Sequence, residues 1–276
     1  MIKLIASDLD DTLLNADGDV SPRVLRALKD AMALGCGIVL ASGRMLEAME
    51  RLAKKIGVNA PMLLYNGAMA HDLSRDETLF KDQIPYDTAL SIAQMCEREG
   101  WYLQAYPGKN YYCTEIQDCT RRYAASIRVE PVEVHMPISE WMQAHPSGMQ
   151  KLLLIDTPEG ADRAQELLRE AFPAGATFFK SRAPYVEIAP EGVDKGRSLT
   201  RLHTLLGVAR EEVIAFGDGQ NDVTMIAAAG TGICMENGCP QAKAAAARIA
   251  PRNTEDGVAQ IIEEYLEKHL IGSYTP

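Results

Sequence analysis

The chain has 276 residues, 47% of them hydrophobic and 24% charged, which is typical of a folded globular protein and excludes wholesale disorder. Lys and Arg number 28 against 38 Asp and Glu, and the resulting formal net charge of −10 disfavours nucleic acid and anionic membranes as partners. We expect no signal peptide and no membrane span, because no apolar run has the required length or flanks. The six cysteines form no CxxC pair, which predicts free thiols and a cytoplasmic protein.

The first third of the chain alternates apolar runs with segments of helical spacing. Residues 2–6, 37–41 and 61–65 read as strands, and residues 22–34 and 44–56 read as helices. The first helix has a good N-cap in Ser21, followed by proline in its first turn. This order favours a parallel α/β sheet with right-handed crossovers.

The pattern changes after about residue 83 and returns from Asp194 onward. Between them lie a predicted helix at 86–99, a hairpin around Pro107-Gly108 and strands near 151–155 and 185–189, which favour an antiparallel α+β insertion. We therefore expect an α/β core with a Rossmann-like parallel sheet, formed by residues 1–83 and 185–276. An α+β domain of residues 84–184 interrupts it.

The chemistry concentrates where predicted strands end. Asp8 and Asp10 directly follow the first strand, and ligands of open parallel sheets lie at the carboxyl ends of the strands. Two carboxylates so close together are costly unless a cation neutralises them. Oxygen ligands without nearby His or Cys point to Mg²⁺.

Three further segments fall at strand ends or helix starts of the same sheet. Ser42-Gly43 offers a hydroxyl and backbone N–H groups that suit a phosphate. Lys195 opens a helix, where a cation is unfavourable for the helix dipole and needs an anionic partner. The segment Gly217–Asp222 adds Asp218, Asn221 and Asp222 after another strand. Together these are the parts needed for Mg²⁺-assisted phosphoryl transfer.

These motifs give the chain a resemblance to the haloacid dehalogenase-like hydrolases, and within them to the Cof-type sugar phosphatase group with a C2-type cap. The matching segments occur in family order over the whole length: DLDDT at 8–12, SGR at 42–44, VDKG at 193–196 and GDGQND at 217–222. The resemblance implies a phosphatase whose inserted cap closes over the active site and selects the leaving group.

The resemblance also implies a role for each residue of these motifs. Asp8 would be the nucleophile that forms an aspartyl-phosphate, and Asp10 the general acid and base. Mg²⁺ would be held by Asp8, the backbone carbonyl of Asp10 and Asp218, with Asp222 supporting the site directly or through water. The transferring phosphoryl oxygens would be bound by four residues: Ser42, Gly43, Lys195 and Asn221. Asp11 stands where the family often has glycine, and we expect activity to survive because aspartate tolerates unusual backbone conformations.

The substrate is expected to be a small phosphorylated metabolite, such as a sugar phosphate or pyridoxal phosphate. A phosphosugar mutase or phosphotransferase on the same fold is the alternative, and a non-catalytic binding protein is disfavoured because Asp8, Asp10, Lys195 and Asp218 are all present. Candidate substrate contacts are Arg44, Arg182 and Tyr185. The sequence leaves the choice between monomer and dimer open.

Overall fold

A computed structural model describes residues 1–108, 110–180 and 182–274 of the chain. The chain divides into two compact units. The first comprises Met1–Gly43, Met49–Phe80 and Asp194–Pro276, and the second comprises Arg44–Ala48 and Lys81–Val193. The second unit thus begins three residues before the boundary expected from the sequence and ends beyond Pro184.

The first unit is built on a five-stranded sheet in which every pair of neighbours is parallel. Its spatial order is β14 (Arg248–Ala250), β13 (Thr231–Met235), β12 (Val213–Gly217), β1 (Leu4–Ser7) and β2 (Gly37–Leu40). Ser7, the last residue of β1, lies opposite Leu40 of β2 and Phe216 of β12. These three neighbouring strands therefore end at the same edge of the sheet, as the positions of the motifs predict.

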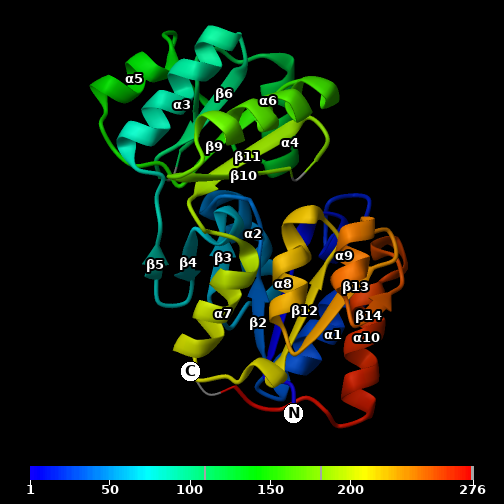
Figure 1. Ribbon diagram of the computed structural model, residues 1–276. Coiled ribbons are helices and arrows are strands. Elements are labelled where there is room, and N and C mark those ends of the chain that lie inside the picture. The colour runs from blue at the N-terminus through cyan, green and yellow to red at the C-terminus, as the bar shows by residue number, and fades with distance from the viewer. Residues whose placement is uncertain (109, 181, 275–276) are drawn as a thin grey trace. The chain divides into compact units, whose positions relative to one another are not determined.

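Helices flank this parallel sheet (Figure 1). They are α1 (Pro22–Ala33), α2 (Leu46–Ile56), α7 (Lys195–Leu205), α8 (Val223–Ala228), α9 (Pro240–Ala245) and α10 (Gly257–Glu267). Leu4 and Ala215 of the sheet share an apolar cluster with Leu199 of α7 and Met225 of α8. Because helices cover the sheet, β1, β2 and β12 are buried along their whole length, which explains their continuous apolar runs.

A second, three-stranded sheet in the first unit was not foreseen. It joins β3 (Met62–Leu64), β4 (Met69–Asp72) and β5 (Glu77–Lys81), and β3 pairs antiparallel with β4. The sequence suggested a parallel strand at 61–65, but only one parallel bridge, from Ala41 to Leu63, links this region to the end of β2. The turn Tyr65–Gly67 reverses the chain at this point.

The second unit has a six-stranded sheet whose apolar core lies on one face. Its order is β10 (Ala176–Phe179), β11 (Tyr185–Pro190), β9 (Lys151–Ile155), β6 (Tyr102–Tyr106), β7 (Tyr112–Cys113) and β8 (Val132–Glu133). Alternate strand residues such as Leu103, Leu154 and Ile188 form one core with α3 (Tyr86–Glu99), α5 (Ile138–Ala144) and α6 (Pro158–Ala171). The remaining helix is α4 (Asp118–Ile127). Antiparallel pairing of β6 with β7 and β9 agrees with the α+β character predicted for the insertion.

Strand β11 explains why the second unit extends past the predicted boundary at residue 184. Glu187 and Ile188 pair antiparallel with Leu153 and Leu152 of β9, and the other edge of β11 pairs with β10. The sequence pattern groups the strand at 185–189 with the antiparallel insertion, but the boundary expected at residue 184 left it in the core. Its pairing partners are distant in sequence, so its sheet could not be identified from local pattern.

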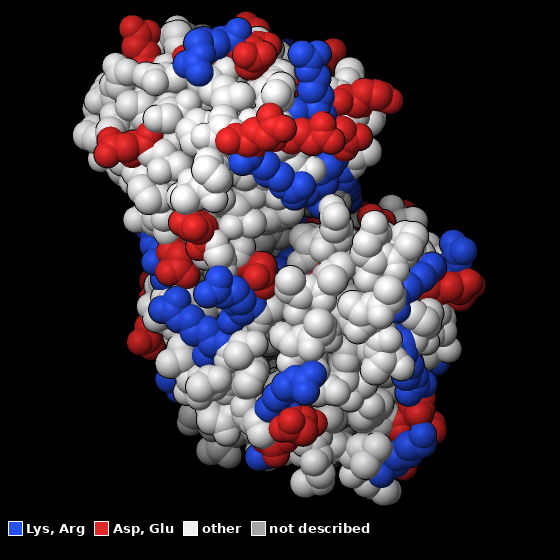
Figure 2. Space-filling view, viewed as in Figure 1, with Lys and Arg blue, Asp and Glu red and all other residues white. Residues whose placement is uncertain are grey.

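The surface charge, the cysteines and the lengths of the helices also bear on the expectations from the sequence. Basic and acidic side chains are interspersed on the face shown in Figure 2, and neither sign dominates it. All six cysteines are unpaired. Among the described residues, no helix combines the length and the apolar character needed to cross a bilayer.

Candidate active site

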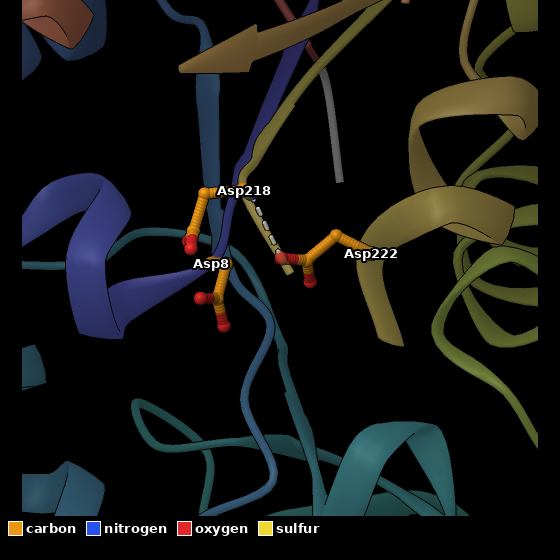
Figure 3. A group of neighbouring side chains, drawn as sticks. All are labelled: Asp8, Asp218 and Asp222. Atoms are coloured by element: carbon orange, nitrogen blue, oxygen red, sulfur yellow. Dashed lines mark hydrogen bonds between the residues drawn. The ribbon is translucent and has the colours of Figure 1, made fainter. Parts of the chain in front are cut away.

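Two carboxylates meet where β1 and β12 end side by side. The backbone N–H of Asp8 donates to the carbonyl of Phe216 over 3.0 Å, which continues the parallel pairing by one residue past β1. Asp218 follows β12 directly in the same way. Figure 3 shows the side chains of Asp8, Asp218 and Asp222 converging at this edge of the sheet. The sheet topology alone therefore brings residues 210 positions apart into one acidic cluster.

The cluster is tight and shielded from solvent. One carboxylate oxygen from each of Asp8, Asp218 and Asp222 lies within 4.8 Å of the others. Burial raises the pKa of Asp8 well above its usual range, and the charge of Asp222 adds to this effect. Burial and the same neighbour raise the pKa of Asp218 to about 7. Such crowding favours binding of a cation among the three oxygens.

Lys195 supplies one positive charge to this cluster. It is the first residue of α7, whose N-cap Asp194 accepts a hydrogen bond from the backbone N–H of Arg197, and its side chain is fully buried. Its Nζ lies 2.6 Å from Oδ1 of Asp8 and 2.6 Å from Oδ1 of Asp222. Burial acts to lower the pKa of Lys195, but the carboxylates of Asp222 and Asp8 outweigh it and raise the pKa. These carboxylates offset the unfavourable position of a cation at a helix N-terminus.

Asp222 shapes the loop that carries Asp218. While Oδ1 of Asp222 faces Lys195, its Oδ2 accepts hydrogen bonds from the backbone N–H groups of Asp218 at 3.0 Å and Gly219 at 2.9 Å. The first of these bonds is dashed in Figure 3. Both oxygens of this buried carboxylate therefore have protein partners, which favours an orienting role for Asp222 beside the expected metal ligands Asp8 and Asp218.

The turn after Asp8 carries two further carboxylates, those of Asp10 and Asp11, which differ from Asp8 in burial and backbone conformation. Residues Leu9–Leu13 form one irregular helical turn in which Asp10 has an extended ψ of 129° and Asp11 has φ 60°. The left-handed conformation of Asp11 is one that glycine adopts without cost and aspartate tolerates, which agrees with the substitution noted at this position. Asp10 is half-buried and Asp11 exposed.

Thr12 in the same turn contacts the acidic cluster, although no role was assigned to it from the sequence. Its hydroxyl is buried and donates to Oδ1 of Asp218 over 2.6 Å. The bond fixes one oxygen of a carboxylate in the cluster. In the sequence, Thr12 is only a small hydroxyl residue within an acidic motif. Such a residue cannot be distinguished from an ordinary helix-capping residue by sequence alone.

The residues expected to bind phosphoryl oxygens lie on two loops at the same edge. Ser42 and Gly43 follow β2, and the backbone N–H of Ser42 donates to the carbonyl of Leu63 over 2.9 Å. The helix predicted to start at Arg44 starts at Leu46 instead, so Gly43 belongs to a loop rather than to a helix N-terminus. Asn221 lies in the loop after β12, where its Nδ2 donates to Oδ1 of Asn66 over 3.0 Å.

The three candidate substrate contacts belong to the second unit. Arg44 groups with this unit, Arg182 lies just before β11, and Tyr185 is the first residue of that strand. The ring of Tyr185 packs edge-on against Tyr123, with 5.7 Å between centroids. The structure therefore gathers eight of the predicted site residues in the first unit, whereas these three remain predictions. The eight are Asp8, Asp10, Ser42, Gly43, Lys195, Asp218, Asn221 and Asp222.

The chain is similar to known proteins over almost its whole length. The family model of haloacid dehalogenase-like hydrolases matches residues 5–262. A phosphatase of Bacillus subtilis, YwpJ, is 28% identical, with 98% of this chain and 100% of the relative covered. The pyridoxal phosphate phosphatase YbhA of Escherichia coli is 27% identical, with 96% and 98% covered.

A solved structure supports the same assignment at the level of the fold. A haloacid dehalogenase-like hydrolase from Bacteroides thetaiotaomicron is 28% identical and superposes with a TM-score of 0.86, covering 96% of this chain and 99% of that one. Because the family model spans residues 5–262, almost all of the chain, the chain belongs to the haloacid dehalogenase-like hydrolase family.

Proposed function

We propose that this hydrolase is a Mg²⁺-dependent phosphatase that removes the phosphoryl group from small phosphorylated metabolites through an aspartyl-phosphate. The observation that carries the proposal is that Asp8 and Asp218 meet at the ends of the neighbouring parallel strands β1 and β12, with the buried Lys195 at the start of α7 2.6 Å from Asp8. It combines a nucleophile, a fixed cation and a second carboxylate that can share a metal with the nucleophile. Phosphoryl transfer depends mainly on such positioning and charge neutralisation.

In the first step a carboxylate oxygen of Asp8 attacks phosphorus, and the bond from phosphorus to the leaving oxygen breaks. Asp10 donates its proton to that oxygen, which leaves as an alcohol. In the second step Asp10 accepts a proton from water as the water oxygen attacks the same phosphorus, which releases phosphate and restores Asp8. Lys195 lies 2.6 Å from Asp8 and favours the charged form that the attack requires.

The residues present suit a magnesium ion. Three carboxylates within 4.8 Å of one another, without a histidine or cysteine among them, form an all-oxygen donor set with an excess of negative charge. Asp8 and Asp218 would hold the ion, with the backbone carbonyl of Asp10 as a further ligand. When bound, the ion neutralises charge that develops on the phosphoryl oxygens.

Protein hydrogen-bond donors would also stabilise the negative charge on the transferring phosphoryl group. The hydroxyl of Ser42, the backbone N–H of Gly43, the ammonium of Lys195 and the amide of Asn221 would donate to the phosphoryl oxygens. All four belong to the first unit. These donors would contact only the phosphoryl group, so they would not distinguish one leaving group from another. The candidates for recognition of the leaving group remain Arg44, Arg182 and Tyr185.

The substrate class follows from the relatives. One is named as a pyridoxal phosphate phosphatase, so phosphorylated vitamins and sugars are the first compounds to try. Net charge of −10 and the interspersed surface charges in Figure 2 argue against nucleic acid as a partner. Six unpaired thiols suit the reducing cytoplasm.

Phosphate release from a panel of phosphorylated metabolites, with Mg²⁺ or with EDTA, tests the proposed function. Wild-type enzyme should release phosphate only with metal, and Asp8→Asn should release none while retaining its fold. Isomerised sugar phosphate without phosphate release would indicate a mutase instead. Release that persists in both EDTA and Asp8→Asn would refute the proposed site.

A further inference from the structure

The turn Tyr65–Gly67 has a backbone conformation that the mechanism above does not use. Three successive residues have positive φ: 53° at Tyr65, 57° at Asn66 and 100° at Gly67. Glycine adopts such angles freely, but an aromatic residue and an asparagine side by side do so at a cost. Strain of this kind persists only where surrounding structure enforces it, and it is concentrated at functional sites.

The turn contacts both loops that are expected to bind the phosphoryl group. The backbone N–H of Asn66 donates to the carbonyl of Ser42 over 2.9 Å. Oδ1 of Asn66 accepts the Nδ2–H of Asn221 over 3.0 Å. A single residue thus links the loop after β2, from its backbone, to the loop after β12, from its side chain.

Close packing fixes the amide of Asn66 from a second side. A Cβ added at Gly43 would lie 2.8 Å from Nδ2 of Asn66, so the amide rests directly against the Gly43 backbone. The side chain of Asn66 is 1% exposed, and among the described residues its Nδ2 has no hydrogen-bond partner. A buried amide donor without a partner is costly, and it needs a reason other than stability.

The last residue of the turn connects to the helix that carries Lys195. The hydroxyl of Ser198 in α7 donates to the carbonyl of Gly67 over 2.8 Å. A Cβ at Gly67 would lie 2.4 Å from that hydroxyl oxygen and 2.9 Å from the carbonyl oxygen of Asp194. The turn therefore lies against all three segments that supply phosphoryl donors.

We propose that Asn66 is a positioning residue that orients the amide of Asn221 relative to Ser42 and Gly43. One N–H of Asn221 is held by Asn66, which aims the second at the phosphoryl group. The inference rests on the proposed function. It assigns Asn66 to the phosphoryl group and not to the leaving group, so its loss should slow all substrates by the same factor.

The test compares Asn66→Gly with His269→Gly. Glycine accepts the left-handed backbone at position 66 and removes only the amide, so the variant should keep the wild-type melting temperature. His269 also has positive φ, at 55°, and is exposed after α10, which makes it a matched control. We expect Asn66→Gly to lower kcat about 10- to 100-fold, as loss of an orienting partner does. Inhibition by inorganic phosphate should weaken as well, while His269→Gly changes neither.

A double variant separates positioning from a merely structural role. If Asn66 acts through Asn221, adding Asn66→Gly to Asn221→Ala should slow turnover by no more than about twofold further, because residues in one network are not additive. Full additivity would overturn the proposal, as would an unequal effect across substrates. An Asn66→Gly variant that fails to fold would assign the residue to stability and overturn it too. Absence of phosphate release by the wild type would refute the proposed function instead.

Discussion

Replacing Lys195 with methionine tests how the acidic cluster is held together. Methionine fills a similar volume but removes the charge that lies 2.6 Å from both Asp8 and Asp222. At an effective dielectric constant of about 20, two like charges 4.8 Å apart repel by about 3.5 kcal/mol. Removing one partner of a buried ion pair typically destabilises a protein by about 3–5 kcal/mol. We expect the free energy of unfolding of Lys195→Met to fall by that amount at neutral pH without metal.

The sign of the pH and metal dependence follows from the same charges. The pKa of Asp8 is already raised in the folded enzyme, so ionisation of this carboxyl costs stability as pH rises through and above its unfolded value. Without Lys195, ionisation of Asp8 costs more stability. The difference in free energy of unfolding between Lys195→Met and the wild type should therefore shrink as pH is lowered and the carboxyls take up protons. Mg²⁺ should stabilise the variant more than the wild type, because a ligand that binds only the folded state stabilises it by mass action.

Urea unfolding with and without Mg²⁺, followed by circular dichroism, measures these differences. Lys54→Met is the control, since Lys54 forms an exposed ion pair with Glu50 whose loss should change stability by less than about 1 kcal/mol. Turnover of Lys195→Met should fall by about 10²- to 10³-fold, as for loss of one donor to a developing anion. A variant as stable as Lys54→Met, with an unchanged response to metal, would refute the electrostatic reasoning.

Three further predictions concern other contacts. Thr12→Val removes the hydroxyl that donates to Asp218 over 2.6 Å, so the Mg²⁺ concentration for half-maximal activity should rise about 10-fold or more; an unchanged metal titration would contradict this. Asp11→Gly suits φ 60° and should retain wild-type kcat, and a loss comparable to that of Asp8→Asn would mean that Asp11 takes part in the reaction. Lys151→Met leaves the buried carboxylate of Glu187 without a lysine that lies 2.9 Å away, and should lower the free energy of unfolding by about 3–5 kcal/mol in urea; a loss no larger than that of Lys54→Met would argue against a strong buried pair.

The position of the acidic cluster could be predicted because Asp8 and Asp218 follow strands of one parallel sheet. Parallel strands are recognisable as buried apolar runs, and their carboxyl ends share one edge. Asp8 and Asp218 directly follow two such runs, and Lys195 starts a helix with a clear N-cap at Asp194. These local signals suffice to bring the three residues together without any knowledge of long-range contacts.

Features that depend on pairing between distant segments could not be predicted in the same way. The strand at 185–189 was recognised, but its antiparallel partners β9 and β10 placed it in the second unit. The pair Asn66-Gly67 is a common turn signal, but nothing in the sequence signals the left-handed backbone of Tyr65 before it. Thr12 and Asn66 were not assigned roles, since a hydroxyl or an amide has a function here only through its partner on another loop.

The proposed mechanism requires Asp8 to carry the phosphoryl group during turnover. Rapid quenching of the enzyme with saturating substrate and Mg²⁺, followed by borohydride reduction, converts an aspartyl-phosphate into homoserine, which peptide mass mapping locates. We expect homoserine at position 8 in the wild type, and none when metal is removed by EDTA. Homoserine at position 10 or 11, or its absence from an enzyme that is releasing phosphate, would exclude Asp8 as the nucleophile.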